Sequence, residues 1–367
     1  MAVATLPVLL PILIREFSLT IGLAGILGFL FRASAAVADP IIAFRSENVL
    51  NRKVILLSGL IICATMLSLY PVSSNFMVIA VITIFAGAAS SVYHPQALTL
   101  LKEATQGKMG TIVGFHGLIG GIGIVLSPLI LTKLIIEVGW KYAVPLTYGP
   151  LIIIACPLLM KYCTNPTKAE KMKFSLSKLG GNEFIYLVTY TGLMSVASLS
   201  MMLFLPLYFQ EIKGLDLASS GLFYSITNVG MLIGMMIGGP LSDRVDRRLI
   251  STFIPFLYSI SFAIFTNVDL PQYIWVGLII SCRMFASSVH PMVMSILAER
   301  PGSPVATSIG MMEAIVYGLS AIAPPIIGAV ADTSGLEFAM GLLVIPSFAA
   351  GILSLTMSKK MMIETVK

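Results

Sequence analysis

Charged side chains are scarce in this sequence of 367 residues. Asp, Glu, Lys and Arg make up only 11% of it and hydrophobic residues 57%, against about 25% and roughly 45–50% in typical soluble domains. A soluble chain of this length would need far more charge to coat its surface. With a mean hydropathy of +0.95, the composition excludes a soluble protein and leaves little length for a domain outside a membrane.

Residues that carry catalytic or metal chemistry are also rare. The sequence has three histidines, and its four cysteines show no CxxC or Cys/His spacing typical of a metal site. We interpret the cysteines as buried apolar residues that form no disulfides. HExxH, GxSxG and nucleotide-binding GxxxxGKS/T motifs are absent, which argues against a membrane-embedded enzyme and an ATP-driven pump. We expect no metal and no cofactor.

The sequence is rich in apolar runs, separated by charged or Gly- and Pro-rich positions. A spanning helix needs about 20 mostly apolar residues, and lipid offers no partner to an unpaired backbone group. We therefore predict an all-α integral membrane protein with about twelve transmembrane helices. The predicted spans are residues 1–14, 20–41, 53–72, 76–101, 109–136, 140–162, 183–205, 218–241, 249–268, 271–298, 304–331 and 335–357.

The first predicted span is short. About 14 apolar residues precede Arg15, which at 1.5 Å per residue make roughly 21 Å of helix against about 30 Å of hydrocarbon. We expect that the first helix is truncated or that its start lies upstream.

Basic residues distinguish the two sides of this bundle. Of the 23 Lys and Arg, 17 fall in alternate loops and the C-terminal tail, four in the other loops, and Arg32 and Arg283 within spans. Short cytoplasmic loops collect basic residues, so we predict a multi-pass plasma-membrane protein with both termini in the cytoplasm. The same clustering explains the net charge of +6 without a nucleic-acid partner.

The two halves of the chain repeat one another. SSVYHPQALTLLKEATQGKMGTIVGF parallels SSVHPMVMSILAERPGSPVATSIGM, and an offset of 196 residues carries His94 and Pro95 onto His290 and Pro291. We predict two parallel six-helix bundles joined by a cytoplasmic linker; their ranges are 1–163, 164–182 for the linker, and 183–367. Parallel repeats with substrate held at their interface are the architecture of a secondary transporter.

A loop motif follows the eighth predicted span. The stretch GGPLSDRVDRR, from Gly238 to Arg248, is similar to the motif G-x-L-x-D-R-x-G-R-R of the major facilitator superfamily, with Asp246 in place of a glycine. Within that superfamily, SSVYHPQ and IGGPLSDRV resemble the fosmidomycin-resistance type of efflux transporter. The resemblance implies the superfamily's fold and a transport function. The matching residues, for which we expect a role in gating, are Gly239, Asp243, Arg244, Arg247 and Arg248.

Ionisable groups at membrane depth are the candidates for chemistry, because each is costly unless it faces a cavity or a partner. Glu313 lies about nine residues into the eleventh predicted span, and we predict that it carries protons. His116, which the offset of 196 residues places opposite Met312, is the second proton-coupling candidate. The alternatives are a protonated Glu313 that bonds two helices together and a helix-packing face around His116.

Two arginines lie so far from the ends of their spans that their side chains cannot easily snorkel to the membrane surface. Cations that face a central cavity would attract an anionic or polar substrate, and Arg binds phosphate or phosphonate oxygens as a bidentate pair. We therefore predict that Arg32 and Arg283 contact the substrate. The alternative is that each pairs with a carboxylate such as Asp39 or Glu313. The further substrate contacts that we predict are Tyr317 and Asn228.

Two His-Pro pairs lie towards the cytoplasmic ends of the fourth and tenth spans. Proline leaves a preceding carbonyl unpaired and bends a helix, and histidine can supply a donor there. A gate and a simple kink are both consistent with this pattern. The gating candidates in the spans are His94, Pro95, His290, Pro291 and Asp39.

These features predict a secondary active transporter that acts as a monomer in the bilayer. We expect proton-coupled efflux of a small polar or anionic compound or drug by alternating access, because no ATP-binding motif is present and an ion gradient must supply the energy. A proton-coupled uptake carrier for an organic anion would use the same cations. A receptor that lost transport is a third alternative, and it would need an additional cytoplasmic region.

Overall fold

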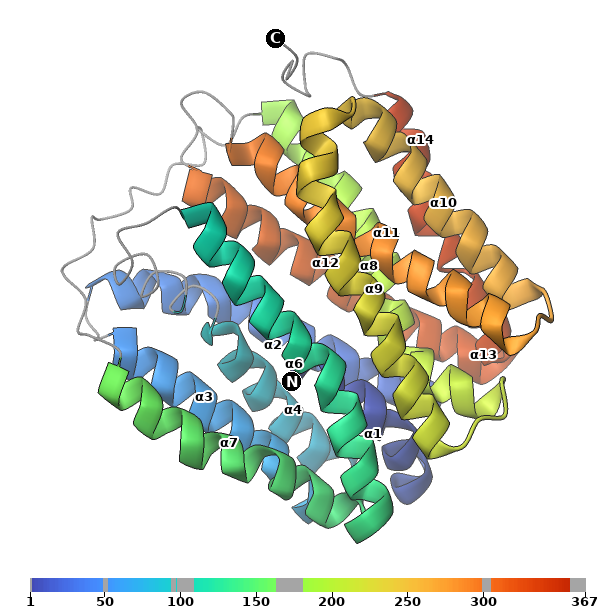
Figure 1. Ribbon diagram of the computed structural model, residues 1–367. Helices are drawn as coiled ribbons and strands as arrows, with labels where there is room; N and C mark the ends of the chain where they lie inside the picture. Colours follow the sequence, from blue (N-terminus) through green and yellow to red (C-terminus); the bar gives the residue numbers. More distant parts are fainter. Residues whose placement is uncertain are drawn as a thin grey trace.

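The computed structural model describes residues 2–48, 52–93, 97, 109–162, 181–298 and 305–356 (Figure 1). Every regular element in these ranges is helical. In chain order the elements are α1 (Ala2–Phe17), α2 (Ile21–Asn48), α3 (Arg52–Ser68), the short 3-10 helix η1 (Tyr70–Val72), α4 (Phe76–Ser91), α6 (Met109–Val138), α7 (Trp140–Tyr162), α8 (Gly181–Glu211), α9 (Leu217–Arg244), α10 (Arg247–Asn267), α11 (Gln272–Ala298), α12 (Val305–Ser334), α13 (Leu336–Gly341) and α14 (Val344–Leu355).

This order reproduces the predicted spans. In the described ranges, ten helical segments are long and apolar enough to cross a membrane, and α4 is a shorter apolar helix. The prediction of an all-α, multi-pass integral membrane protein is therefore confirmed. Of the predicted linker, residues 164–180 lie outside the described ranges, and α8 begins at Gly181.

The twelfth predicted span is not one continuous helix. Helix α13 ends at Gly341 and α14 begins at Val344, with a turn at Leu342 and Leu343 between them. Pro346 has no N–H to donate to the carbonyl of Leu342 one turn earlier, so a helical hydrogen bond that would bridge the two is missing. The span predicted over 335–357 is present as the apolar helical segment Leu336–Leu355, which this turn interrupts.

The helices of the second half begin where an offset of 196 residues places those of the first. Helices α2, α4 and α7 begin at residues 21, 76 and 140, and α9, α11 and α13 begin at residues 217, 272 and 336. This register is the one expected of the two parallel six-helix repeats that we predicted. The exact ends of the two bundles, at 163 and 183, stay predictions.

The halves meet through contacts that the repeat relates to one another. Helix α2 packs against α12, α6 packs against α9, and α1 packs against α8. The offset converts the α2–α12 contact into the α9–α6 contact and leaves the α1–α8 contact unchanged. The interface therefore has the two-fold pseudo-symmetry expected of parallel repeats.

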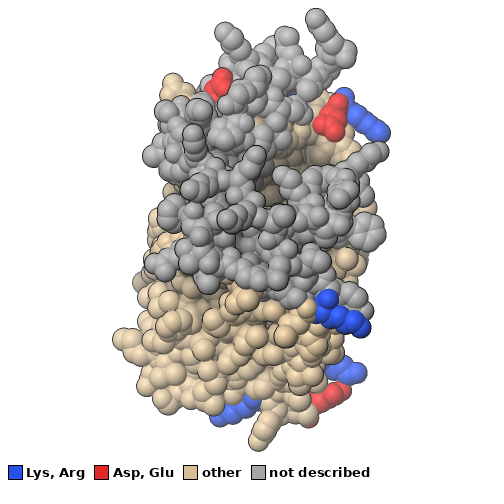
Figure 2. All heavy atoms as spheres, turned by 90° about the vertical axis from the view of Figure 1, so that its left-hand side faces the viewer, with Lys and Arg blue, Asp and Glu red and all other residues tan. Residues whose placement is uncertain are grey.

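The interior of the bundle is formed largely by α1 and α8. Leu9, Leu10 and Leu13 of α1 are fully buried, as are Tyr190 and Tyr208 of α8. Helices at the periphery instead expose large apolar side chains, which in a membrane protein face lipid. On the side shown in Figure 2, the described surface is mostly uncharged, with a few Lys, Arg, Asp and Glu near its margin.

Candidate functional site: a cavity between the two halves

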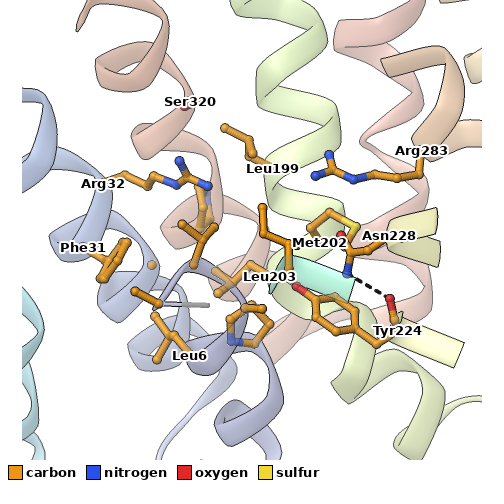
Figure 3. Close-up of a pocket in the computed structure, with 17 residues that line it drawn as sticks. Leu6, Phe31, Arg32, Leu199, Met202, Leu203, Tyr224, Asn228, Arg283 and Ser320 are labelled. Carbon is orange, nitrogen blue, oxygen red and sulfur yellow. Dashed lines mark hydrogen bonds between the residues drawn. The ribbon is translucent and has the colours of Figure 1, made fainter. Parts of the chain in front are cut away.

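A cavity of about 70 Å³ lies between the two halves. Residues of α1, α2 and α6 line one side of it, and residues of α8, α9, α11 and α12 line the other (Figure 3). Most of the lining is apolar. The polar residues that line it are Arg32, Tyr224, Asn228, Arg283 and Ser320.

Much of the lining comes from positions that the repeat makes equivalent. The pairs related by the offset of 196 residues are Val3 and Leu199, Leu6 and Met202, Pro7 and Leu203, Gly28 and Tyr224, Arg32 and Asn228, and Ile124 and Ser320. The cavity therefore lies on the axis that relates the halves, where a secondary transporter holds its substrate. Arg283 breaks this symmetry, because its equivalent in the first half is Gly87.

The guanidinium groups of Arg32 and Arg283 extend into the cavity from opposite sides (Figure 3). Arg283 donates to Ser198 Oγ at 3.0 Å and to Met231 Sδ at 3.1 Å. The guanidinium carbon of Arg32 lies 5.7 Å from the centroid of the Tyr317 ring. Tyr317 thus lies beside Arg32 but is not among the residues that line this cavity, and its contact with the substrate stays a prediction.

Neither cavity arginine forms an ion pair with a described carboxylate. The ion pairs within 4.0 Å in the described ranges involve other residues. The alternative in which Asp39 or Glu313 neutralises Arg32 or Arg283 is therefore not observed. The cavity holds two positive charges that no described carboxylate compensates.

Asn228 and Tyr224 form the polar wall opposite Arg32. Asn228 is 1% exposed and donates from Nδ2 to the backbone carbonyl of Tyr224 at 3.0 Å. Its Oδ1 is buried with no hydrogen-bond partner in the described structure. Sequence reasoning missed Tyr224 and Ser198. The signals available were that Tyr224 lies one helical turn before Asn228 and that the repeat places it opposite Gly28.

A second polar group, which we call the titratable cluster, consists of Asp39, His290 and Glu313. His290 Nε2 lies 3.2 Å from Glu313 Oε1, and these side chains are 49% and 30% exposed. The carboxyl groups of Asp39 and Glu313 are close enough for their negative charges to repel one another. The cluster joins a residue of the first half to two residues of the second.

The titratable cluster is separated from the cavity along the bundle. Asp39 and His290 lie seven residues after the two cavity arginines on α2 and α11, and Glu313 lies seven residues before Ser320 on α12. Seven residues are two helical turns, about 10 Å. Because α12 is antiparallel to α2, Asp39, His290 and Glu313 all lie on the same side of the cavity, towards the same end of the bundle.

A pair between Arg283 and Glu313 was the alternative interpretation of these residues, and His116 was the second proton-coupling candidate. The structure pairs Glu313 with His290, which lies two helical turns from Arg283 on α11. His116 belongs to α6, but its side chain lies outside the described part of the structure, as do His94 and Pro95. Helix α11 continues through Pro291 to Ala298. The contact between His290 and Glu313 joins a predicted gating residue to a predicted proton carrier.

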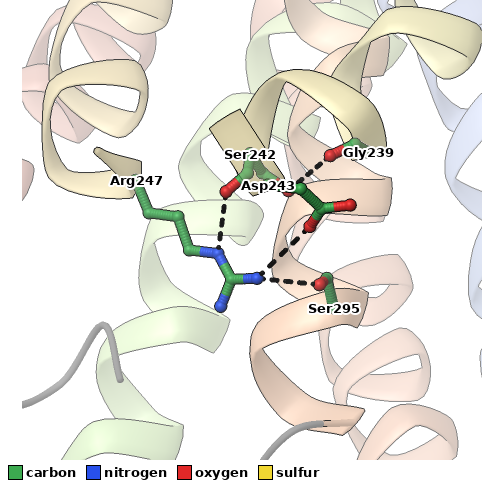
Figure 4. Close-up of polar contacts among 5 residues, drawn as sticks. All are labelled: Gly239, Ser242, Asp243, Arg247 and Ser295. Carbon is green, nitrogen blue, oxygen red and sulfur yellow. Dashed lines mark hydrogen bonds and ion pairs between the residues drawn. The ribbon is translucent and has the colours of Figure 1, made fainter. Parts of the chain in front are cut away.

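The loop motif after α9 is organised around Arg247 (Figure 4). The Arg247 side chain is 2% exposed; it donates to the Ser242 carbonyl at 3.2 Å and to Ser295 Oγ at 3.0 Å, and lies 3.6 Å from Asp243 Oδ1. The Gly239 carbonyl accepts from Ser242 Oγ at 2.7 Å. These contacts bind α9, α10 and α11 of the second half to one another.

The other charged residues of the motif have different surroundings. Arg244 is exposed, and Arg248 donates to the Leu355 carbonyl of α14 at 3.3 Å. Asp246, where the motif has glycine, caps α10 by accepting from the Arg248 amide at 2.8 Å. The departure from the motif therefore supplies a helix N-cap. The gating role of these residues stays a prediction.

At the end of the bundle away from Arg247, the two halves are in direct contact. Asp332 of α12 accepts hydrogen bonds from the amides of Ile21 at 2.7 Å and Gly22 at 2.9 Å, at the start of α2. A Cβ on Gly25 would lie 2.3 Å from the Pro324 carbonyl oxygen. Arg15 and Glu211, equivalent positions of the repeat, form an ion pair at 2.9 Å. We call this the Asp332 end, and it is closed in the structure.

Comparison with known proteins identifies the family. The sequence model of the Major Facilitator Superfamily matches residues 1–321. The chain belongs to the Major Facilitator Superfamily. Two curated relatives in this superfamily cover most of its length. A fosmidomycin resistance protein of Escherichia coli (strain K12) is 20% identical over 350 residues, covering 89% of this chain and 82% of the relative. An uncharacterised MFS-type transporter, YfnC, of Bacillus subtilis (strain 168) is 23% identical over 346 residues, covering 91% and 83%.

Solved MFS structures share the fold. A bacterial homologue of the human lysosomal transporter Spinster, in an inward-facing and unoccupied conformation, superposes with a TM-score of 0.78 at 14% identity, covering 96% of this chain and 92% of that one. The nucleoside transporter NupG gives 0.78 at 12% identity, covering 99% and 96%. The predicted superfamily is thus confirmed, and membership places the chain among transporters and not among enzymes.

Proposed function

We propose that this MFS protein is a proton-coupled antiporter that exports a small anionic or strongly polar compound by alternating access. The observation that carries the proposal is the pair of guanidinium groups of Arg32 and Arg283, which line one cavity between the halves without a carboxylate partner among the described residues. The fosmidomycin resistance relative favours export over uptake.

Anion binding follows from the electrostatics of the cavity. The two guanidinium groups interact unfavourably with one another, and an anion between them would replace this repulsion with two attractions. Charge-assisted hydrogen bonds from arginine are roughly twice as strong as neutral ones, and they reach bidentate geometry with carboxylate, phosphate or phosphonate oxygens. The apolar walls raise the strength of these interactions by excluding water.

Proton coupling is assigned to the titratable cluster. Glu313 faces His290 from α11, Asp39 from α2 and Tyr317 one turn along α12, and the partial exposure of His290 and Glu313 lets water reach both. Protonation of Glu313 would change the charge at the contact between the halves about two turns from the substrate. Such a change biases the equilibrium between conformations without direct contact with the substrate.

Alternating access explains why the cavity is small in this conformation. Ligand sites usually measure about 300–1,000 Å³, whereas this cavity has about 70 Å³, so the halves must separate to admit a substrate. The Asp332 end is closed. The excess of basic residues in alternate loops supports a cytoplasmic location for the opposite end and for both termini, which would make the closed end the extracellular side of a plasma-membrane protein.

Flux in proteoliposomes tests the anion site. Arg32→Gln and Arg283→Gln should each reduce initial flux of a subsaturating anion about tenfold or more, because each removes charge-assisted bonds of about 1.5–3 kcal/mol. Lys133→Gln is the matched control, since this exposed cation of α6 pairs only loosely with Glu137 at 3.9 Å; its flux should stay within about twofold of wild type. Full flux in both arginine variants would refute the site.

Direction is tested in cells and vesicles. A strain without the protein should gain sensitivity to an anionic drug, and inside-out vesicles should accumulate that drug when a proton gradient is imposed. Unchanged sensitivity combined with loss of growth on one organic anion would instead establish uptake.

A further inference from the structure

The Asn228 side chain has one fixed orientation. Its Nδ2 donates to the Tyr224 carbonyl at 3.0 Å, and the opposite orientation would bring two acceptor oxygens together. Oδ1 is therefore the atom of this amide that can accept a hydrogen bond in the cavity. It is buried, it has no partner in the described structure, and its residue lines the cavity (Figure 3).

An unpartnered donor lines the same cavity. Arg283 Nε is buried and has no hydrogen-bond partner in the described ranges, although the two other nitrogens of this guanidinium bind Ser198 and Met231. Buried polar atoms are nearly always paired. Among the cavity-lining residues that the structure describes, Asn228 Oδ1 is thus a buried acceptor without a partner and Arg283 Nε a buried donor without one.

The repeat accounts for the different polar groups on the two sides of the cavity. Arg32 and Asn228 occupy equivalent positions of the two halves, a cation in one half and an amide in the other, and the second half supplies its own cation, Arg283, from a different position. The two arginines alone would serve a symmetric dianion, whereas Asn228 Oδ1 adds an acceptor that Arg32, its equivalent, cannot provide. The asymmetric lining instead fits a molecule with chemically different ends.

We infer that the substrate is a small oxyanion that also carries an O–H or N–H donor within a few bonds of its anionic group, and that Asn228 Oδ1 accepts a hydrogen bond from this donor. The inference rests on the proposed anion site and adds a specificity-determining residue to it. Hydroxylated phosphonates and hydroxy acids belong to this class; simple alkyl anions do not.

Three phosphonates test the inference with purified protein. 2-Hydroxyethylphosphonate has the donor, 2-methoxyethylphosphonate replaces it with a methyl ether, and ethylphosphonate lacks the oxygen altogether, so the two controls bracket the first compound in size. Wild-type protein should bind the hydroxyl compound about tenfold or more tightly than either control, since a site built around a hydroxyl discriminates against analogues that lack it. Binding is measured by titration calorimetry in detergent.

Variants assign the discrimination to Asn228. In Asn228→Leu the three affinities should converge to within about twofold, whereas Ser225→Ala, which alters a buried residue of α9 outside the cavity lining, should keep the preference. Equal binding of all three compounds by wild-type protein, with binding still lost in Arg283→Gln, would overturn the inference and leave the anion site intact. Absence of binding by all three, or binding that Arg283→Gln does not change, would overturn the proposed function itself.

Discussion

Asp332 acts across the two halves as a cap on α2. Its two carboxylate oxygens accept hydrogen bonds from the amides of Ile21 and Gly22, which are among the unsatisfied donors of a helix N-terminus. A carboxylate at such a position contributes about 0.3–1 kcal/mol when exposed and up to about 2 kcal/mol in favourable geometry. Because Asp332 is exposed and makes two bonds, we expect Asp332→Ala to destabilise the closed end by about 1–2 kcal/mol, a factor of roughly 5–30 in population.

Accessibility labelling measures this shift. In a background without the four native cysteines, Leu6→Cys places a thiol in the cavity lining, and an impermeant maleimide added from outside should label it about 5–30 times faster when Asp332→Ala is present. Asp216→Ala is the matched control, because Asp216 accepts from the Ser219 amide at 2.8 Å and caps only its own helix, α9. Equal labelling rates in the two variants would refute the role of Asp332.

Three further predictions concern packing. Arg247→Ala should lower the free energy of unfolding in detergent by about 2–3 kcal/mol, because it removes a buried guanidinium together with its hydrogen bonds to Ser242 and Ser295, whereas Arg244→Ala should change it by less than about 0.5 kcal/mol. Gly25→Ala should open the Asp332 end and accelerate the same cysteine labelling, since its Cβ would lie 2.3 Å from a carbonyl oxygen; Gly277→Ala, which meets no atom within 4 Å, should not. Ser198→Ala removes a hydrogen bond that positions Arg283 and should raise the KM for anion flux several-fold with little change in kcat.

The sequence predicted those features that depend on spacing along the chain. The offset of 196 residues, first seen at the His-Pro pairs, recurs in the starts of three pairs of helices and in six pairs of cavity-lining residues. Arg32 and Arg283 line the cavity, as expected because a charge deep in a span has few other stable environments. Asn228, a polar residue in a span, lines it too, and the contact of all three with the substrate stays a prediction.

The contacts that sequence reasoning missed depend on how helices pack. His290 and Glu313 lie on different helices, and only the rotation of α11 against α12 brings them to 3.2 Å. Arg244 and Arg247 look alike in the motif, yet only Arg247 is buried, because Ser295 of α11 lies within its reach. Tyr317 was predicted as a substrate contact, and sequence reasoning did not foresee that its ring lies against Arg32.

Proton movement coupled to anion flux tests the central claim most directly. Proteoliposomes that contain a pH-sensitive dye are given an inward gradient of 2-hydroxyethylphosphonate, and the pH in the lumen is recorded together with anion uptake. We predict that wild-type protein moves protons in the opposite direction to the anion, that Glu313→Gln still exchanges labelled anion but moves no protons, and that Arg283→Gln does neither. Unchanged proton movement in Glu313→Gln, or anion flux in Arg283→Gln equal to that of wild type, would contradict a cavity that binds the anion and a separate cluster that carries the proton.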